Sequence, residues 1–288
     1  MYDVYLPSNE VLKKHIRFIY AYKNVTHQEQ FSVVPFVGVA LTVFENAKFS
    51  EISERVFCVE PHEHTTVVLH AMRADSVEVI IKGEVNAFML MLTPLGINHF
   101  IRQPLGNFLH FHSRSVIPFH NYAEGYPELA AKLQSTEAVH HKLEHIEQFL
   151  LNNYHHFEND LLREAVHFLS DTDNTDSIHK ICRQIGVSER TLNRLFQKYL
   201  CISPIQLRNI CRFRSSIDLR LQKDLSFCEL ALESNYTDHA YLVRVYKKFT
   251  GRSPKEIFKQ LESRVRDNYL FSLIQQRLSE KYNHNDKV

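Results

Sequence analysis

The same order of apolar, basic and aromatic residues occurs twice in this chain, fifty positions apart. SERTLNRLFQKYLCISP, residues 188–204, aligns without a gap with DHAYLVRVYKKFTGRSP, residues 238–254. The identical positions are Leu192/Leu242, Arg194/Arg244, Lys198/Lys248, Ser203/Ser253 and Pro204/Pro254. An internal repeat indicates that one supersecondary unit is used twice, and it constrains the fold of this region more than any single motif does.

The repeat extends upstream when one inserted residue is allowed. With an offset of 49 it pairs Ser177/Ser226, Ile181/Leu230, Cys182/Ala231 and Gly186/Asn235. Small residues fit where two helices cross, and glycine or asparagine accepts the positive φ of a tight turn. Each unit is therefore predicted to be a helix-turn-helix. Pro204 is expected to begin a long helix over residues 204–222 between the units.

A stack of helical hairpins, an α-solenoid, is the alternative fold for such a repeat. It would need at least three units placed back to back. This chain has two, separated by a long helix that matches neither unit. The helix-turn-helix plan is therefore favoured.

The second helix of the first unit has two different faces. Leu192, Leu195, Phe196 and Tyr199 follow the spacing of one buried stripe. The complementary stripe consists of Arg190, Asn193, Arg194 and Gln197. Long hydrogen-bonding side chains of these types can read base edges in a DNA major groove, since Arg grips guanine and Asn or Gln grips adenine.

The second copy keeps the buried stripe, and its outer stripe is less polar. The outer positions are His239, Ala240, Val243, Arg244 and Lys247. His239 and Arg244 can hydrogen-bond to bases, whereas Ala240 and Val243 can only contact thymine methyl groups. We therefore expect the first unit to carry more sequence information and the second to contribute more affinity for phosphates.

The charge of the chain is unevenly distributed. Residues 174–266 hold 18 Lys and Arg against 9 Asp and Glu, a net charge of +9, whereas the other residues hold 16 against 24, a net charge of −8. Such asymmetry suggests that the basic part meets a polyanion, although a solvated basic surface would have the same composition.

These motifs in this order resemble the double helix-turn-helix domain of AraC/XylS-type transcriptional regulators. The matching residues are Leu192, Arg194, Phe196; Ser203, Pro204; Arg212; Leu242, Arg244, Tyr246; Gly251, Ser253 and Pro254. The resemblance covers about residues 158–262. The chain departs from the family pattern at Cys201 and Asn235, where the family has glycine, and at Tyr246, where it has phenylalanine. Cys201 is expected to strain or reshape its turn.

The resemblance implies that both second helices enter successive major grooves on one face of DNA, about 34 Å apart. Base-reading positions carried over from the family are Arg190, Asn193, Arg194, His239, Ala240 and Arg244, to which the two faces above add Gln197 and Val243. Phosphate contacts are expected from the helix starts at Ser177 and Ser188 and from nearby cations. Those cations are Lys198, Arg212, Lys247, Lys248 and Arg252.

The first half of the chain is predicted to be rich in β-structure. Apolar runs between residues 31 and 112 read as several short strands, which suggests a cupin-like barrel or a sandwich. Helices are expected at 127–135, 137–154 and 161–171. The predicted class is α+β with two domains. The expected parts are a sensor-like domain at 1–125, linker helices at 126–157, a DNA-binding domain at 158–262, and a C-terminal helix with a disordered tail at 263–288.

In AraC/XylS-type proteins the part before the DNA-binding domain senses a small molecule or mediates dimerisation. The resemblance therefore implies three partners besides operator DNA: a small-molecule effector, a second copy of the chain, and RNA polymerase if the protein is an activator. The apolar edge of residues 143–154 either forms the dimer interface or packs on the β domain.

Histidines suggest a rival function. Fifteen of the 18 precede residue 174, and His62 and His64 form an H-x-H pair. Three such ligands could hold a metal in a cupin-type sensor or enzyme. A cupin motif would add a carboxylate three or four residues later, where this chain has Val67 and Val68. We therefore expect no metal and no cofactor.

Catalysis and membrane insertion find no support in the sequence. It contains no nucleophile elbow, P-loop or dinucleotide fingerprint, so no catalytic residue is expected. No run of eighteen apolar residues and no signal peptide is recognisable, and the five cysteines contain no C-x-x-C pair. A cytoplasmic protein is expected. A protein-interaction module that has lost specific DNA binding is a further alternative.

Overall fold

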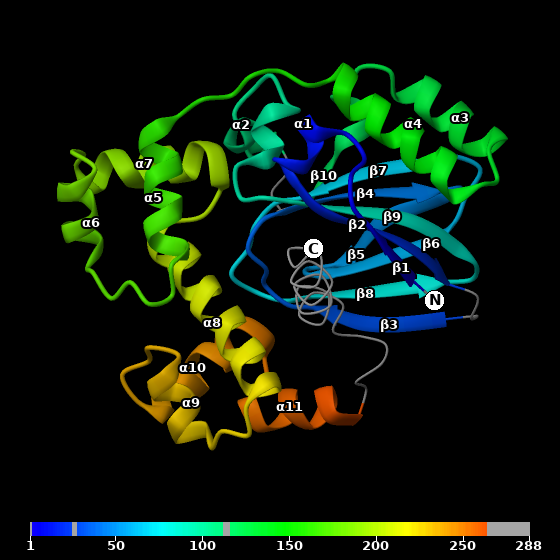
Figure 1. Cartoon of the computed structure of the whole chain (residues 1–288). Coiled ribbons are helices and arrows are strands. Elements are labelled where there is room, and N and C mark those ends of the chain that lie inside the picture. Colours follow the sequence, from blue (N-terminus) through cyan, green and yellow to red (C-terminus); the bar gives the residue numbers. More distant parts are fainter. Residues whose placement is uncertain (1, 25–27, 112–115, 264–288) are drawn as a thin grey trace, which may run out of the picture.

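The computed structural model describes residues 2–24, 28–111 and 116–263. Within this part the chain forms a β-rich N-terminal domain followed by a helical region (Figure 1). The helix expected after residue 263 and the tail lie outside the described residues.

Two sheets build the N-terminal domain. The larger sheet consists, in order, of β1 (Tyr2–Tyr5), β2 (Ile16–Asn24), β9 (Val85–Leu92), β4 (Val39–Glu45), β7 (Thr66–His70) and β10 (Val116–Pro118). The smaller sheet consists of β3 (Gln28–Val33), β8 (Val77–Lys82), β6 (Val56–Pro61) and β5 (Ala47–Ser53). All pairings are antiparallel except that between β6 and β8.

The sheets pack against each other through one apolar layer. Phe44, Val68 and Ala87 of the larger sheet meet Val59 and Ile81 of the smaller one. Every residue of β4 is buried, because its other face is covered by helices. This double burial explains why the run VALTVFE shows no alternation of apolar and polar residues.

Helices cover the outer face of the larger sheet (Figure 1). They are α1 (Glu10–Lys13), the single-turn 3-10 helix η1 (Gly96–His99), α2 (Leu105–Phe111), α3 (Tyr126–Ser135) and α4 (Val139–Asn152), with the single-turn η2 (Phe119–Asn121) nearby. Leu143, Ile146, Phe149 and Leu150 on α4 are buried in the same cluster as Leu41 and Leu90 of the sheet. The apolar edge of α4 thus packs on the β domain, and a dimer, which stays a prediction, would need another surface.

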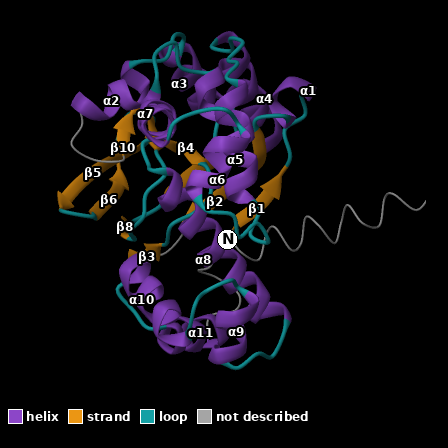
Figure 2. Cartoon of the chain, turned by 90° about the vertical axis from the view of Figure 1, so that its left-hand side faces the viewer, coloured by secondary structure: helices purple, strands orange, loops and turns teal. Residues whose placement is uncertain are grey.

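The helical region follows the predicted plan. It comprises α5 (Asp160–Ser170), α6 (Ile178–Gln184), α7 (Glu189–Leu200), α8 (Pro204–Gln222), α9 (Phe227–Glu233), α10 (His239–Thr250) and α11 (Pro254–Ser263). The first unit is α6 with α7 and the second is α9 with α10. The long helix α8 runs from one unit to the other (Figures 1 and 2). No helix in the described ranges combines the length and the apolarity needed to span a bilayer.

Local signals placed these helices correctly. The Ser177 and Ser188 side chains accept hydrogen bonds from Lys180 N and Thr191 N and so cap α6 and α7. Pro204 stands in the first turn of α8, as expected. Gly186 and Asn235 have φ of +70° and +57° in the two turns.

The expectations for the β-rich half were wrong in detail. Strand structure begins well before residue 31, with β1 and β2, and α2 lies inside the region where strands were favoured. The run FSVVPFVGVALTVF is two strands, interrupted between β3 and β4. The break includes Gly38, where only glycine fits, since its φ is +139° and a Cβ there would lie 2.2 Å from Leu92 O.

Replacing Gly186 with alanine should destabilise the first unit. An added Cβ meets nothing within 4 Å, so only the left-handed backbone opposes it. We expect the free energy of unfolding to fall by about 1–2 kcal/mol in chemical denaturation. Arg183→Ala, an exposed change on the preceding helix, should cost less than about 0.5 kcal/mol. Equal effects of the two changes would contradict the assignment of the turn.

Candidate nucleic-acid interface

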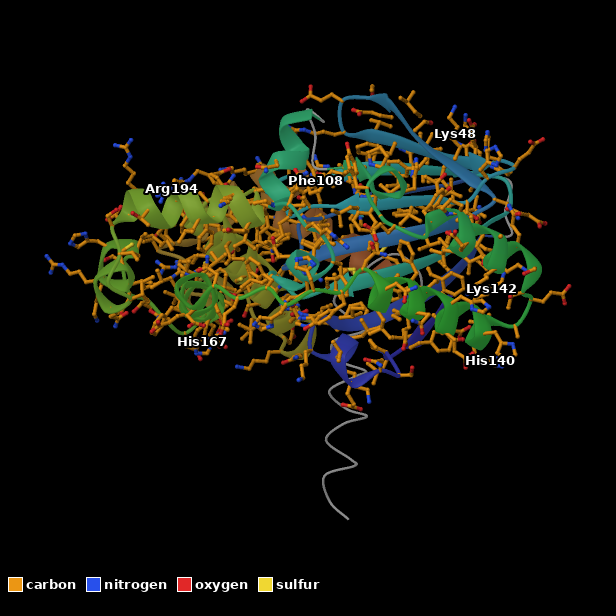
Figure 3. The ribbon with its side chains drawn as sticks, turned by 90° about the horizontal axis from the view of Figure 1, so that it is seen from above. Lys48, Phe108, His140, Lys142, His167 and Arg194 are labelled. Atoms are coloured by element: carbon orange, nitrogen blue, oxygen red, sulfur yellow. The ribbon has the colours of Figure 1, made fainter. Side chains whose placement is uncertain are left out.

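The predicted reading face of α7 points away from the protein. Leu192 and Phe196 are fully buried, and Leu195 and Tyr199 are partly buried against the same core. Arg190, Asn193, Arg194 and Gln197 are all exposed. Figure 3 shows Arg194 extending outward from α7. One side of this helix is thus anchored while the other is free to meet a ligand.

Few contacts restrain the exposed side chains of α7. Asn193 Nδ2 donates to Glu189 O at 2.9 Å, a bond along the helix that a stronger acceptor can replace. Within the described part of the chain neither Arg190 nor Arg194 forms an ion pair. Two unpaired guanidinium groups on one face therefore remain available for bases or phosphates.

The corresponding face of α10 carries fewer polar side chains than that of α7, and two of them contact aromatic rings. His239 stacks on Phe227 with ring centroids 6.3 Å apart, and the Arg244 guanidinium lies 5.6 Å from the Tyr241 ring centroid. Ala240 is exposed and Val243 is half-buried. Fewer groups of this helix can therefore hydrogen-bond to base edges.

The predicted phosphate-contacting residues differ in how far they are exposed to solvent. Lys198, Lys247 and Lys248 are exposed near the ends of α7 and α10. Lys198 Nζ lies 5.0 Å from the Tyr199 ring centroid. Arg252 is half-buried, whereas Ser177 and Ser188 lie at exposed helix starts. Their phosphate contacts stay predictions.

Arg212 differs from the other cations of this set. It is half-buried on α8, its Nε has no hydrogen-bond partner, and its charge acts on Tyr236 of the second unit. Burial raises the pKa of Tyr236, and the Arg212 charge opposes this rise. Arg212 therefore lies close to the second unit, and its phosphate contact stays a prediction.

A separate cavity lies between the two sheets of the N-terminal domain. Its volume is about 110 Å³, and most of its lining is aromatic and aliphatic, including Tyr20, Phe31 and Met89. His70 also lines it, and burial, followed by the charge of Arg73, lowers the pKa of His70 to about 4. The hydroxyl of Thr42 is buried there without a partner.

A second, more polar cavity of about 400 Å³ lies between β2, β9 and α8. Arg17, Arg214 and Asp218 line it, and Arg214 and Phe36 line both cavities. Arg214 is only 8% exposed. Burial lowers the pKa of Arg214 and raises that of Asp218, and each opposes the other's shift. Sequence reasoning missed this site because its residues come from distant segments with no common motif.

The histidines expected for a rival metal site do not converge in the described residues. His62 and His64 are exposed, with ring centroids 5.2 Å apart. His70 instead faces the apolar cavity between the sheets. Across the described ranges no group of three or more His, Cys, Asp or Glu could hold a metal ion.

The helical region therefore consists of two helix-turn-helix units whose second helices each expose a polar or basic face. A family model described as a helix-turn-helix domain matches residues 181–260. The arabinose operon regulatory protein of Escherichia coli (strain K12) is 29% identical over 108 residues, which span 37% of this chain and 37% of that protein. The helical region thus matches a helix-turn-helix domain and is similar to part of that regulator, of whose length this chain spans about a third.

Solved structures to which the chain is distantly similar include those of ToxT from Vibrio cholerae. ToxT of strain O395 bound to (E)-4-(8-methylnaphthalen-1-yl)but-3-enoic acid has a TM-score of 0.47 and 11% identity, covering 90% of this chain and 99% of that one. Unsaturated fatty acid bound wild-type ToxT of strain SCE256 has a TM-score of 0.45 and 13% identity, covering 83% and 93%. Likeness at this level assigns no ligand or activity to this chain.

The exposed face of α7 should be dispensable for folding. Arg194→Ala and Gln197→Ala remove side chains without buried contacts, so the free energy of unfolding should change by less than about 0.5 kcal/mol. Leu192→Ala, on the opposite side of the helix, should cost about 2–5 kcal/mol. Denaturant titration of the three variants measures this difference. A loss above 1 kcal/mol in Arg194→Ala would instead assign that arginine a structural role.

Proposed function

We propose that the protein is a sequence-specific DNA-binding transcriptional regulator. The observation that carries this proposal is the pair of helices, α7 and α10, each buried on one side and exposed on the side that holds its basic and amide residues. The net charge of +9 over residues 174–266 favours DNA over a protein partner.

The two units are proposed to contribute differently to DNA binding. α7 presents Arg190, Asn193, Arg194 and Gln197, none of which is held by a buried partner, and so reads most of the sequence. α10 adds Arg244 and His239 but mainly supplies phosphate affinity through Lys247 and Lys248. Because the units are tandem in one chain, the site recognised by one molecule is asymmetric. Binding to RNA polymerase and dimerisation remain predictions.

Selection of binding sites from random duplex DNA with the full-length protein tests the DNA-binding proposal. We expect an asymmetric motif that spans two adjacent major grooves. Arg194→Ala should weaken binding to this motif by about 1–3 kcal/mol and relax the preference at one position, because Arg194 loses its base contact. Lys248→Ala should weaken all sequences similarly and reduce the salt dependence.

Base-pair exchanges under each half of the motif test the division of work. The half read by α7 should lose more affinity per exchange than the half read by α10. Greater sensitivity under α10 would contradict this division. Binding that is salt-sensitive but blind to sequence would leave only a nonspecific DNA-binding protein.

We infer that the N-terminal domain binds an effector, an organic anion with a small apolar body. The cavity between the sheets, at about 110 Å³, approaches the size of cavities that accept a benzene ring. The adjoining cavity offers Arg17 and Arg214, both largely removed from water. A buried cation is costly unless a counter-charge neutralises it. Asp218 of the same cavity acts on Arg214 without forming an ion pair with it, so one carboxylate faces the two cations Arg17 and Arg214.

The position of Arg214 links this site to the DNA-binding region. It belongs to α8, the helix that joins the two units, while Arg17 belongs to β2 of the sensor-like domain. An anion held between the two arginines would bind one domain to the other. An effector could thus bias the placement of α8, since its affinity would differ between the domain arrangements.

Ligand-induced stabilisation tests the effector proposal. Benzoate, phenylpropanoate and decanoate are compared with the corresponding alcohols in thermal unfolding. At a hundredfold excess over its dissociation constant a bound carboxylate should stabilise the fold by about 2.7 kcal/mol. Arg214→Gln should abolish this gain, whereas Arg220→Gln should keep it, because Arg220 lines neither cavity and loses only contacts with Asp224 and the Phe258 ring. Equal stabilisation by acids and alcohols would overturn the role of the arginines.

A further inference from the structure

The C-terminal end of α7 lies against the N-terminal domain. The last carbonyls of a helix lack partners within the helix and need donors from elsewhere. Asn98 Nδ2 donates to Tyr199 O at 3.2 Å, across 101 residues of chain, and to its neighbour Leu95 O at 3.3 Å. Asn98 is only 2% exposed. A side chain of the sensor-like domain therefore caps the end of the first DNA-reading helix.

Gly106 on α2 brings the two backbones together at the same place. A Cβ at this position would lie 2.8 Å from Gln197 O and 3.0 Å from Lys198 O. Both distances are below normal van der Waals contact, and the atoms they meet belong to the backbone. Only glycine permits this approach, and α2 packs directly against α7.

Cys201 completes the contact from the α7 side. It follows the helix with φ of +61°, a conformation that is unfavourable for any residue with a side chain. Its counterpart in the second unit is Gly251, which has φ of +72° and nothing within 4 Å of an added Cβ. The Cys201 side chain, by contrast, packs against the core of the N-terminal domain. Its burial offsets the backbone cost that glycine would avoid.

We propose that Asn98, Gly106 and Cys201 form a clamp through which the N-terminal domain positions α7 for DNA. This inference rests on the proposed DNA-binding function. The three residues touch only the end of α7 and leave Arg190, Asn193 and Arg194 exposed, so the clamp orients the reading face without covering it.

The clamp acts on one unit. α10 packs mainly on α8, α9 and α11, and its end has glycine in place of Cys201. A helix held in its binding orientation before DNA arrives loses less conformational freedom on binding. The first half of the DNA site, read by α7, therefore gains affinity from the N-terminal domain, and the second half gains none directly.

Three full-length variants test the clamp. Cys201→Gly copies the second unit and removes the packing side chain, Asn98→Ala removes the cap, and Gly106→Leu pushes α2 away from α7. Each should weaken binding to the selected DNA site about fivefold or more, the usual lower range for coupling between sites. Discrimination against base exchanges should fall in the half read by α7 and stay unchanged in the half read by α10. Cys228→Ala, at an exposed cysteine of α9, is the control and should bind as the unchanged protein does.

Thermal unfolding of each variant separates loss of the clamp from loss of the fold. Unchanged affinity and discrimination in all three variants would overturn the proposal, as would an equal loss in both halves. Failure of the unchanged protein to select any motif would instead count against the proposed DNA-binding function.

A measurement that needs no DNA tests the clamp even if the protein selects no DNA motif. In a Cys228→Ala background the Cys201 thiol should react slowly with a maleimide, because it is packed between the domains. Asn98→Ala and Gly106→Leu should each accelerate this reaction about fivefold or more, by the same coupling argument. Equal rates with and without these changes would show that no clamp holds the end of α7.

Discussion

Burial of the inner face of α8 is the interaction on which the arrangement of this protein depends. α8 packs on α5, on α7 of the first unit, and on α9 and α10 of the second. The Phe213 ring lies 4.9 Å from that of Tyr246 and 5.2 Å from that of Phe249, centroid to centroid. Burying one such ring contributes about 1.5–3 kcal/mol. The same helix carries Arg214 toward the N-terminal domain, so one element sets the spacing of the units and joins them to the cavities.

The departures from the AraC/XylS-type pattern each have a local explanation. Tyr246, in place of phenylalanine, donates its hydroxyl hydrogen to Ser216 Oγ at 2.8 Å, while Ser216 donates to Phe213 O. Asn235, in place of glycine, has a left-handed backbone, and its Nδ2 donates to Thr172 O at 2.9 Å. At Cys201, in place of glycine, the unfavourable left-handed backbone is offset by packing of the side chain against the N-terminal domain. The substitutions thus add polar or apolar contacts between elements that glycine or phenylalanine could not make.

Sequence reasoning succeeded where structure is decided locally. The helices of the two units follow from a spacing of three to four residues and from caps such as Ser177, Ser188 and Pro204, all of which act within one turn. It was less successful in the β-rich half. β2 is buried on both sides for much of its length, so it lacks the alternation that marks a strand. α2 packs against α7, a partner much later in the chain, and this contact leaves no signal in the local sequence.

The sequence by itself determined the repeated unit, the exposed and buried faces of α7 and α10, and the charge that distinguishes one half of the chain from the other. Periodicity and capping are properties of neighbouring residues, so they can be recognised in the sequence without knowledge of the fold. Only the tertiary structure decided that Arg17 and Arg214 share a cavity, that the edge of α4 is covered, and that Asn98 caps α7. These contacts join residues that lie far apart in the chain, and long-range packing leaves no periodic trace in a single sequence.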